Sequence, residues 1–267
     1  MTSRGADRSA LDAAQVVEMG REMRSLLGLS GSPVGVALIR SGEPRPDGAL
    51  ELRRHRYCQA VMKARKGQDV VLDGMGIACP AAAAAFGFRA LPAGLQSGGG
   101  LVGFGIVSQP ATGGRMFHDM PRLPIGSIEA LHLFPLEEAH RPPDVVVVED
   151  EVERLMWIAL ASLHISGGER VNASTAVLQA MCVDSTIIPY LEGRLNLGFG
   201  CYGCREATDI EPGEAALGFP VSALGPIVEH LEFLSQKAIP NSRSKRALHS
   251  LGAGESGAGG DGQAVEP

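Results

Sequence analysis

The chain has 267 residues, of which 45% are hydrophobic and 20% charged, and its net charge at pH 7 is −6. This length and composition support a sizeable buried core, and the mixed charges argue against a basic surface for nucleic acid. No stretch approaches the roughly 20 apolar residues of a membrane-spanning helix, and no apolar segment follows the arginines of residues 1–10. We therefore expect a cytoplasmic protein without nucleic-acid or membrane partners.

Helices and strands are expected to alternate along the chain. Apolar residues recur at helical spacing in several segments, whereas short branched runs, such as the four valines at 145–148, are typical of buried strands. The helices are expected over residues 9–27, 57–65, 79–86, 150–165, 176–181 and 221–238. The strands are expected over residues 33–39, 69–72, 128–134, 144–148, 170–175 and 215–219. This order favours an α/β or α+β fold with helices flanking a mixed sheet.

The domain organisation follows from where this alternation stops. It continues to residue 238, which predicts a single globular domain over residues 1–240. Residues 241–267 lose the apolar period and become rich in glycine and alanine, so we expect a disordered tail. Inside the domain, the glycine-rich segment 95–105 is expected to form a flexible loop leading into a short strand. It lacks the lysine and Ser/Thr of a Walker phosphate loop.

The most specific motif in the chain is a pair of cysteines in a glycine-rich segment. Cys201 and Cys204 lie in the sequence Gly-Phe-Gly-Cys-Tyr-Gly-Cys-Arg, which ends at Arg205. The glycines allow the backbone to wrap closely around a bound group. Because a lone C-x-x-C pair suits thiol–disulfide exchange, half of a zinc site or part of an iron–sulfur site, the remaining ligands must decide the chemistry.

Three further cysteines are candidates for such ligands. Cys58 follows a run of basic residues at 53–56, and Cys79 precedes Pro80 at an expected helix start; both environments favour a thiolate. Cys182 lies in an apolar setting that is more typical of core packing. Five cysteines without a secretory signal argue against a disulfide framework and favour thiols or metal ligation.

Several alternatives are weakened by the context of these motifs. A thioredoxin-like site would place the pair between a strand and a long helix, but an acidic turn follows it at residues 209–214. A structural zinc site would need a second close pair, and Cys58 and Cys79 are too far apart in sequence to supply one. No Gly-x-Ser-x-Gly motif supports a hydrolase, and the seven histidines show no ligand spacing.

Several cysteine-bearing and glycine-bearing segments together resemble a prokaryotic family of uncharacterised proteins, number 169 in the series of domains of unknown function. They are residues 33–37, 57–61, 64–67, 78–87 and 200–205. The resemblance extends from Leu26 to Ala238 and implies a stand-alone soluble domain without a settled reaction. It also implies that Cys58, Cys79, Cys182 and Cys201 match recurring cysteines, whereas the position of Cys204 often carries another residue. Cys182 is therefore an alternative fourth ligand.

We expect the cysteine-bearing loops to converge on one pocket and to hold an iron–sulfur cluster of four irons. Its ligands would be Cys58, Cys79, Cys201 and either Cys182 or Cys204, with Arg205 and the basic run offsetting the negative charge. Such a cluster would serve redox chemistry or activate a small molecule at an open iron, with a small-molecule substrate or an electron-transfer partner. The alternatives are a zinc or copper thiolate site and a thiol–disulfide oxidoreductase using Cys201 and Cys204.

Overall fold

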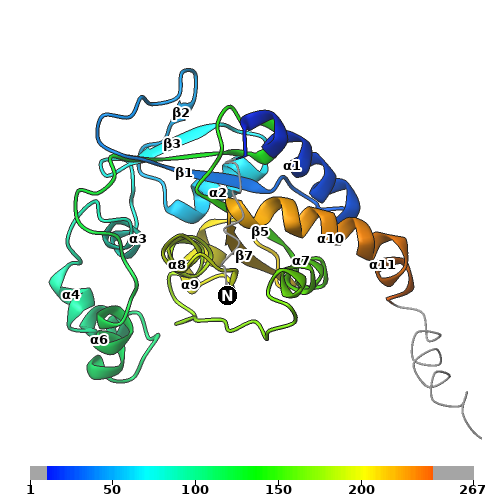
Figure 1. Ribbon diagram of the computed structural model, residues 1–267. Coiled ribbons are helices and arrows are strands. Elements are labelled where there is room, and N and C mark those ends of the chain that lie inside the picture. The colour runs from blue at the N-terminus through cyan, green and yellow to red at the C-terminus, as the bar shows by residue number, and fades with distance from the viewer. Residues whose placement is uncertain (1–10, 243–267) are drawn as a thin grey trace, which may run out of the picture.

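The computed structural model describes residues 11–242, which are built around one seven-stranded sheet (Figure 1). The strand order is β2-β3-β4-β1-β5-β7-β6, and every neighbouring pair is antiparallel except the parallel pair β2 and β3. The expectation of a mixed sheet flanked by helices is confirmed. The strands are β1 (Val34–Ile39), β2 (Leu50–Glu51), β3 (Val70–Asp73), β4 (Ala130–Pro135), β5 (Val145–Glu151), β6 (Asn196–Gly198) and β7 (Glu214–Pro220).

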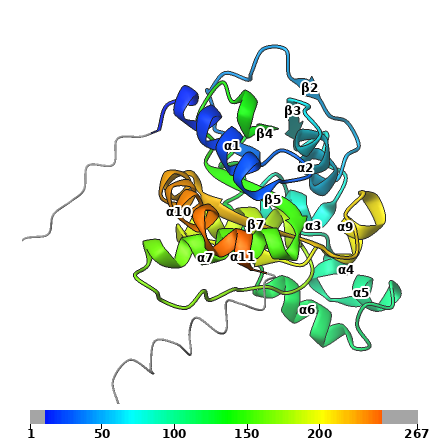
Figure 2. The same ribbon diagram turned by 90° about the vertical axis from the view of Figure 1, so that its right-hand side faces the viewer.

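One face of the sheet is covered by three long helices. They are α1 (Ala13–Leu27), α7 (Val152–Ile165) and α10 (Leu224–Gln236), and the short α11 (Ala238–Asn241) follows. Figures 1 and 2 show α10 beside both α1 and α7, and alternate side chains of β5 and β7 pack beneath them. Two short 3₁₀ turns, η1 (Leu136–Glu138) and η3 (Val221–Ala223), follow strands on this side.

The opposite face carries the four helices that hold or directly follow the cysteines, together with α8 (Ile188–Glu192). The four are α2 (Tyr57–Arg65), α3 (Pro80–Ala85), the π-helix η2 (Ala180–Ile187) and α9 (Tyr202–Ala207). The five alanines of α3 are buried, because small side chains let neighbouring elements approach this helix closely. The side chains of β1, β3 and β4 that point to this face complete a second hydrophobic core. Both faces of the sheet are therefore covered, as the buried valines of β5 predict.

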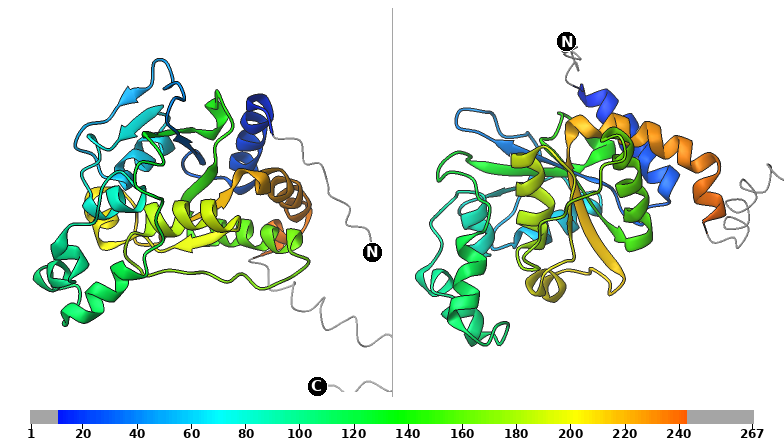
Figure 3. Two further views of the ribbon diagram at one scale, coloured as in Figure 1. Left: turned by 60° about the vertical axis from the view of Figure 1, so that its left-hand side comes forward. Right: turned by 60° about the horizontal axis from the view of Figure 1, so that its bottom comes forward.

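A group of short helices stands at the edge of the molecule. It consists of α4 (Ala93–Gln96), α5 (Gly99–Gly103) and α6 (Pro110–His118), which pack mainly against one another (Figures 2 and 3). The expected loop and strand at residues 95–105 are therefore wrong. Gly98 has a φ of +74°, and a Cβ there would overlap the Pro110 carbonyl oxygen, so this glycine is required where α5 meets α6.

The segment before η2 also differs from the expectation. Residues 170–175 form no strand, because the side chain of Asn196 takes the place of a neighbouring strand and exchanges two hydrogen bonds with the backbone of Ser174, at 2.8 and 2.9 Å. The helix expected over residues 176–181 is replaced by η2, which begins later and contains Cys182 in its first turn. Of the tail expected over residues 241–267, Asn241 belongs to α11, and residues 243–267 lie outside the described residues. Within residues 11–242, no helix is long and apolar enough to cross a membrane.

Candidate functional site

All five cysteines lie on the wall of one pocket, which has a volume of about 390 Å³. They arrive from four segments that are far apart in the sequence: Cys58 from α2, Cys79 from the start of α3, Cys182 from η2, and Cys201 and Cys204 from α9. None of the five forms a disulfide. The structure thus brings together every cysteine that the sequence analysis singled out.

The closest pair of thiols belongs to α9. Cys201 is the residue that precedes the helix, Cys204 lies in its first turn, and their sulfur atoms are 3.2 Å apart. Gly200 has a φ of +75°, which turns the chain sharply into this helix. Cys58 interacts with Cys204 closely enough to raise its pKa, so the Cys58 thiol lies near this pair.

The other thiols also lie at helix starts. Cys79 immediately precedes α3, Cys58 is the second residue of α2, and Cys182 is the third residue of η2. Helix N-termini carry a partial positive charge, which favours negative charge nearby. The four helix starts therefore provide a common electrostatic bias toward an anionic group in this pocket.

Side-chain hydrogen bonds fix the cysteine-bearing helices relative to one another. The Tyr57 hydroxyl and the Thr186 Oγ1 lie 2.8 Å apart in the core and join α2 to η2. The Gln59 side-chain amide donates to the Ala207 carbonyl at 3.1 Å and joins α2 to α9. Because both bonds start from the first turn of α2, the position of Cys58 is coupled to the positions of the other thiols.

Two glycines on the sheet allow η2 to approach it. A Cβ at Gly198 of β6 would lie 2.8 Å from the Ala180 carbonyl oxygen, and a Cβ at Gly218 of β7 would overlap the Ser185 carbonyl oxygen. These positions lie on neighbouring strands, with Gly218 paired to Asn196. The edge of the sheet therefore presents bare backbone to η2, which holds Cys182 at the pocket.

The cation nearest the thiols is Arg56 rather than Arg205. Arg56 lines the pocket and donates hydrogen bonds to the Gly203 carbonyl at 2.8 Å and to the Glu206 carboxylate at 2.7 Å. The expected cofactor-binding residue Arg205 is not among the residues that line the pocket. Its guanidinium donates to three carbonyl oxygens, those of Phe199, Glu211 and Glu214.

Burial and mutual contact disfavour thiolates at this site. Burial raises the pKa of Cys182 well above its usual value, and the hydrogen bond with Cys204 raises that of Cys201. The hydrogen bond with Cys201 lowers the pKa of Cys204, but the contact with Cys58 and burial outweigh it and raise this pKa to about 12. These three thiols are therefore protonated at neutral pH unless a bound cation displaces their protons.

The remaining wall of the pocket is mostly apolar. The helices α4 to α6 and the segment between them supply Leu95, Leu101, Ile106 and Phe117, and Leu178 contributes from the segment before η2. Phe104 and Tyr202 also line the pocket, and their exposed fractions of 71% and 62% place them at its entrance. The sequence analysis missed this wall. The sequence feature that could have indicated it is the set of apolar residues between the glycines of residues 95–107.

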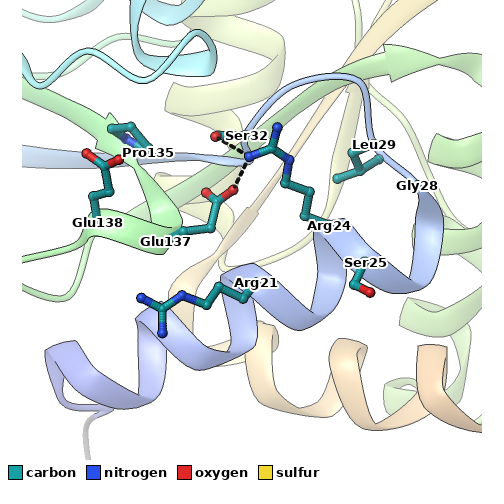
Figure 4. A pocket seen from close by; sticks show the side chains of 9 residues that line it. All are labelled: Arg21, Arg24, Ser25, Gly28, Leu29, Ser32, Pro135, Glu137 and Glu138. Carbon is teal, nitrogen blue, oxygen red and sulfur yellow. Dashed lines mark hydrogen bonds and ion pairs between the residues drawn. The ribbon is translucent and has the colours of Figure 1, made fainter.

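Two other cavities are polar and lie away from the thiols. One lies beside the C-terminal half of α1, where Arg24 reaches both Ser32 and Glu137 (Figure 4). The other contains Arg65, which donates to the buried Glu149 at 2.7 Å and to Glu214 at 2.5 Å. In both cavities the cations are engaged with carboxylates of the same chain.

Within residues 11–242, no group of three or more His, Cys, Asp or Glu side chains is arranged to hold a single metal ion. The ligands of a four-iron cluster differ from those of one ion, because each thiolate binds its own iron atom and the sulfurs stand farther apart. The closest thiols here are a pair, Cys201 and Cys204, and Cys58 interacts with Cys204.

Fold and site together define an α/β protein with a thiol-lined pocket. The model of the family DUF169, described as uncharacterised ArCR, matches residues 22–230, so the chain belongs to this family. The matched range includes all five cysteines and the helices that carry them. No curated protein and no solved structure matches the chain.

Proposed function

We propose that this protein binds an iron–sulfur cluster of four irons in the thiol-lined pocket and uses it for redox chemistry. The observation that carries the proposal is the presence of five thiols from four separate segments on the wall of one 390 Å³ pocket. Iron–sulfur clusters are held by cysteine thiolates in this way.

The thiols of the pocket become ligands only when iron displaces their protons. The pKa values of Cys182, Cys201 and Cys204 are raised, so these thiols stay neutral without a ligand. Iron binding displaces their protons, as coordination does for thiols in general. Arg56 and the helix starts then offset the net negative charge of the thiolate-bound cluster.

We take Cys58, Cys79, Cys182 and Cys201 as the four ligands. The sulfurs of Cys201 and Cys204 are 3.2 Å apart, which is too close for two ligands of different irons. One of the two therefore binds iron while the other donates a hydrogen bond to it. We assign the hydrogen-bonding role to Cys204. Such bonds to cluster sulfurs tune reduction potentials, and the cluster would receive its electron from an electron-transfer partner.

The close sulfur pair is also the one observation that favours a thiol–disulfide oxidoreductase as an alternative. A disulfide requires an attacking thiolate, and reactive cysteines have a pKa near or below neutral pH. The pKa values of Cys201 and Cys204 are instead raised, the latter to about 12. The exchange reaction is therefore disfavoured, and we rank it below cluster binding.

Anaerobic purification followed by reconstitution with ferrous iron and sulfide tests the proposal. We expect four irons and four sulfides per chain in the wild type, a brown colour, and an electron paramagnetic resonance signal on reduction. A double variant, Cys58→Ser with Cys79→Ser, serves as the ligand-deficient control and should retain little iron. A colourless wild-type protein without iron after reconstitution would overturn the proposal, whereas one zinc or copper ion without sulfide would establish the soft-metal alternative.

A further inference from the structure

The pocket has two chemically different sides. The thiols form one side, and the other is an apolar wall, which we define as Leu95, Leu101, Phe104, Ile106, Phe117 and Leu178. A buried cluster needs no such wall at the pocket entrance, where Phe104 is 71% exposed. Small-molecule sites are typically about 300–1,000 Å³ in volume and mostly apolar, with a few polar groups that fix orientation. The pocket fits that description.

The charged side chains on the pocket wall offer no unpaired partner to a charged small molecule. Arg56 and Glu206 are the two charged side chains that line it, and they form an ion pair with each other at 2.7 Å. Arg56 is further engaged with the Gly203 carbonyl. A charged ligand would lose its hydration against the apolar wall without gaining an unpaired partner. The lining therefore selects an uncharged molecule.

One polar side chain faces this space without a partner. Gln179 lines the pocket and is 7% exposed, yet its side-chain amide makes no hydrogen bond within the described part of the chain. Its backbone carbonyl accepts a bond from Cys182, which fixes the residue next to the thiols. A ligand carbonyl or hydroxyl group that pairs with this amide would replace the water that otherwise solvates it.

The backbone at Gln179 is also unusual. Its φ is +57°, and Val177 two residues earlier has a φ of +63°. The left-handed region is uncommon for residues other than glycine, and for a β-branched valine it is strained. Such strain concentrates at ligand sites, where it holds a side chain in a required position. Here the two positive φ values lie where the chain enters η2, and Gln179 lies on the pocket wall.

We propose that the pocket binds an uncharged small molecule with an apolar ring or chain and one carbonyl or hydroxyl group. The apolar part lies on the wall formed by α4 to α6, and the polar group pairs with the Gln179 amide beside the thiols. This proposal names the substrate class of the proposed function. The redox reaction of that substrate rests on the proposed cluster, whereas its binding to the pocket does not.

Three matched probes test the inference: 2-naphthol, which is neutral and has a hydroxyl, naphthalene, which lacks one, and the anionic 2-naphthoate. Fluorescence titration of anaerobic protein, with and without reconstituted iron, gives each dissociation constant. We expect 2-naphthol to bind at least tenfold more tightly than 2-naphthoate and several-fold more tightly than naphthalene. Equal or tighter binding of 2-naphthoate, or no binding of 2-naphthol, would overturn the inference.

Variants assign the binding to the named residues. Gln179→Leu should remove the advantage of 2-naphthol over naphthalene and leave naphthalene binding unchanged. Gln179→Asn tolerates a positive φ and serves as a second variant in case Gln179→Leu does not fold; its shorter amide should reduce the same advantage. Phe104→Ala should weaken both ligands. Phe233→Ala, with a similar exposed fraction of 64% on α10, is the matched control and should change neither.

The design separates this inference from the proposed function. Protein that binds 2-naphthol but never acquires iron and sulfide would contradict the cluster and leave the ligand class intact. Protein that acquires the cluster but binds none of the three probes, with or without iron, would contradict the ligand class alone. An unchanged preference for 2-naphthol in both folded Gln179 variants would also overturn the assignment.

Discussion

Gly218 of β7 lies directly against the Ser185 carbonyl oxygen of η2, and no side chain fits between them. This contact sets the distance between the edge of the sheet and the π-helix. Because η2 carries Cys182 in its first turn, the contact also places one of the thiols of the pocket. The backbone of Gly218 therefore helps to fix the position of the Cys182 side chain, which lies about one helical turn from Ser185.

Gly218→Ala is expected to lower the free energy of unfolding by about 3 kcal/mol, because the new methyl group forces η2 away from the sheet. Urea denaturation measures this loss. Gly213→Ala is the matched control, since a Cβ there meets no atom within 4 Å and the change should stay within about 0.5 kcal/mol. Equal stability of the two variants would show that η2 does not depend on the bare backbone of β7.

The identity of the fourth cluster ligand gives a second prediction. Cys182→Ser should remove most of the bound iron, because it deletes a ligand. Cys204→Ser should retain the cluster, because no ligand is lost, and shift its reduction potential, because a hydroxyl replaces the thiol as hydrogen-bond donor near the Cys201 sulfur. Iron analysis and redox titration of the two reconstituted variants measure these effects. Loss of iron in Cys204→Ser with full iron in Cys182→Ser would reverse the assignment.

Arg56 gives a third prediction, since it is the cation on the wall of the pocket. Arg56→Gln should lower the reduction potential by an amount on the order of 50 mV, because the reduced cluster is more negative and loses more stabilisation. Arg53→Gln is the matched control. It removes the same charge from the same basic run, but Arg53 pairs with Glu51 and Asp73 on the surface. Equal shifts in both variants would indicate a general charge effect without a specific role of Arg56.

The parts of the fold that the sequence predicts are those with a strong local pattern. The valines of β5 and the branched run of β1 indicate buried strands, and both form the centre of the sheet. The helix α2 matches its expected bounds, residues 57–65. The three-residue β6 has no such pattern, because its pairing with β7 is decided by tertiary contacts and not by its own residues.

The sequence predicts which cysteines line the site, but not the arrangement of the other residues around them. Cysteine spacing and glycine content indicated Cys58, Cys79, Cys182, Cys201 and Cys204, and all five line the pocket. The apolar wall depends on glycines that allow α5 and α6 to touch. In the sequence, these same glycines indicated a flexible loop. Which arginine faces the thiols depends on side-chain hydrogen bonds. Those bonds tie Arg205 to carbonyl groups outside the pocket and leave Arg56 beside it.

A buried carboxyl group far from the thiols gives the last prediction. The Glu149 side chain is 1% exposed, its Oε1 accepts from Arg65 at 2.7 Å, and its Oε2 has no partner. Burial raises the pKa of Glu149 to about 7 despite the nearby charge of Arg65. Because the folded-state pKa exceeds the unfolded value of about 4.5, the folded protein binds the proton more tightly. The contribution of Glu149 to stability is therefore full below pH 4.5 and declines as the pH rises through 7.

Glu149→Gln mimics the protonated carboxyl group and should remove this decline. At pH 8 we expect the variant to be more stable than the wild type by up to about 3 kcal/mol, and at pH 4.5 the difference should nearly vanish. Urea denaturation at both pH values measures the difference in the free energy of unfolding. Glu138→Gln, a change at an exposed carboxylate, is the control and should alter stability by less than about 0.5 kcal/mol at either pH. If Glu149→Gln instead destabilised the protein more at pH 8 than at pH 4.5, the ionised carboxylate would be a net stabilising partner of Arg65, and the raised pKa would be wrong.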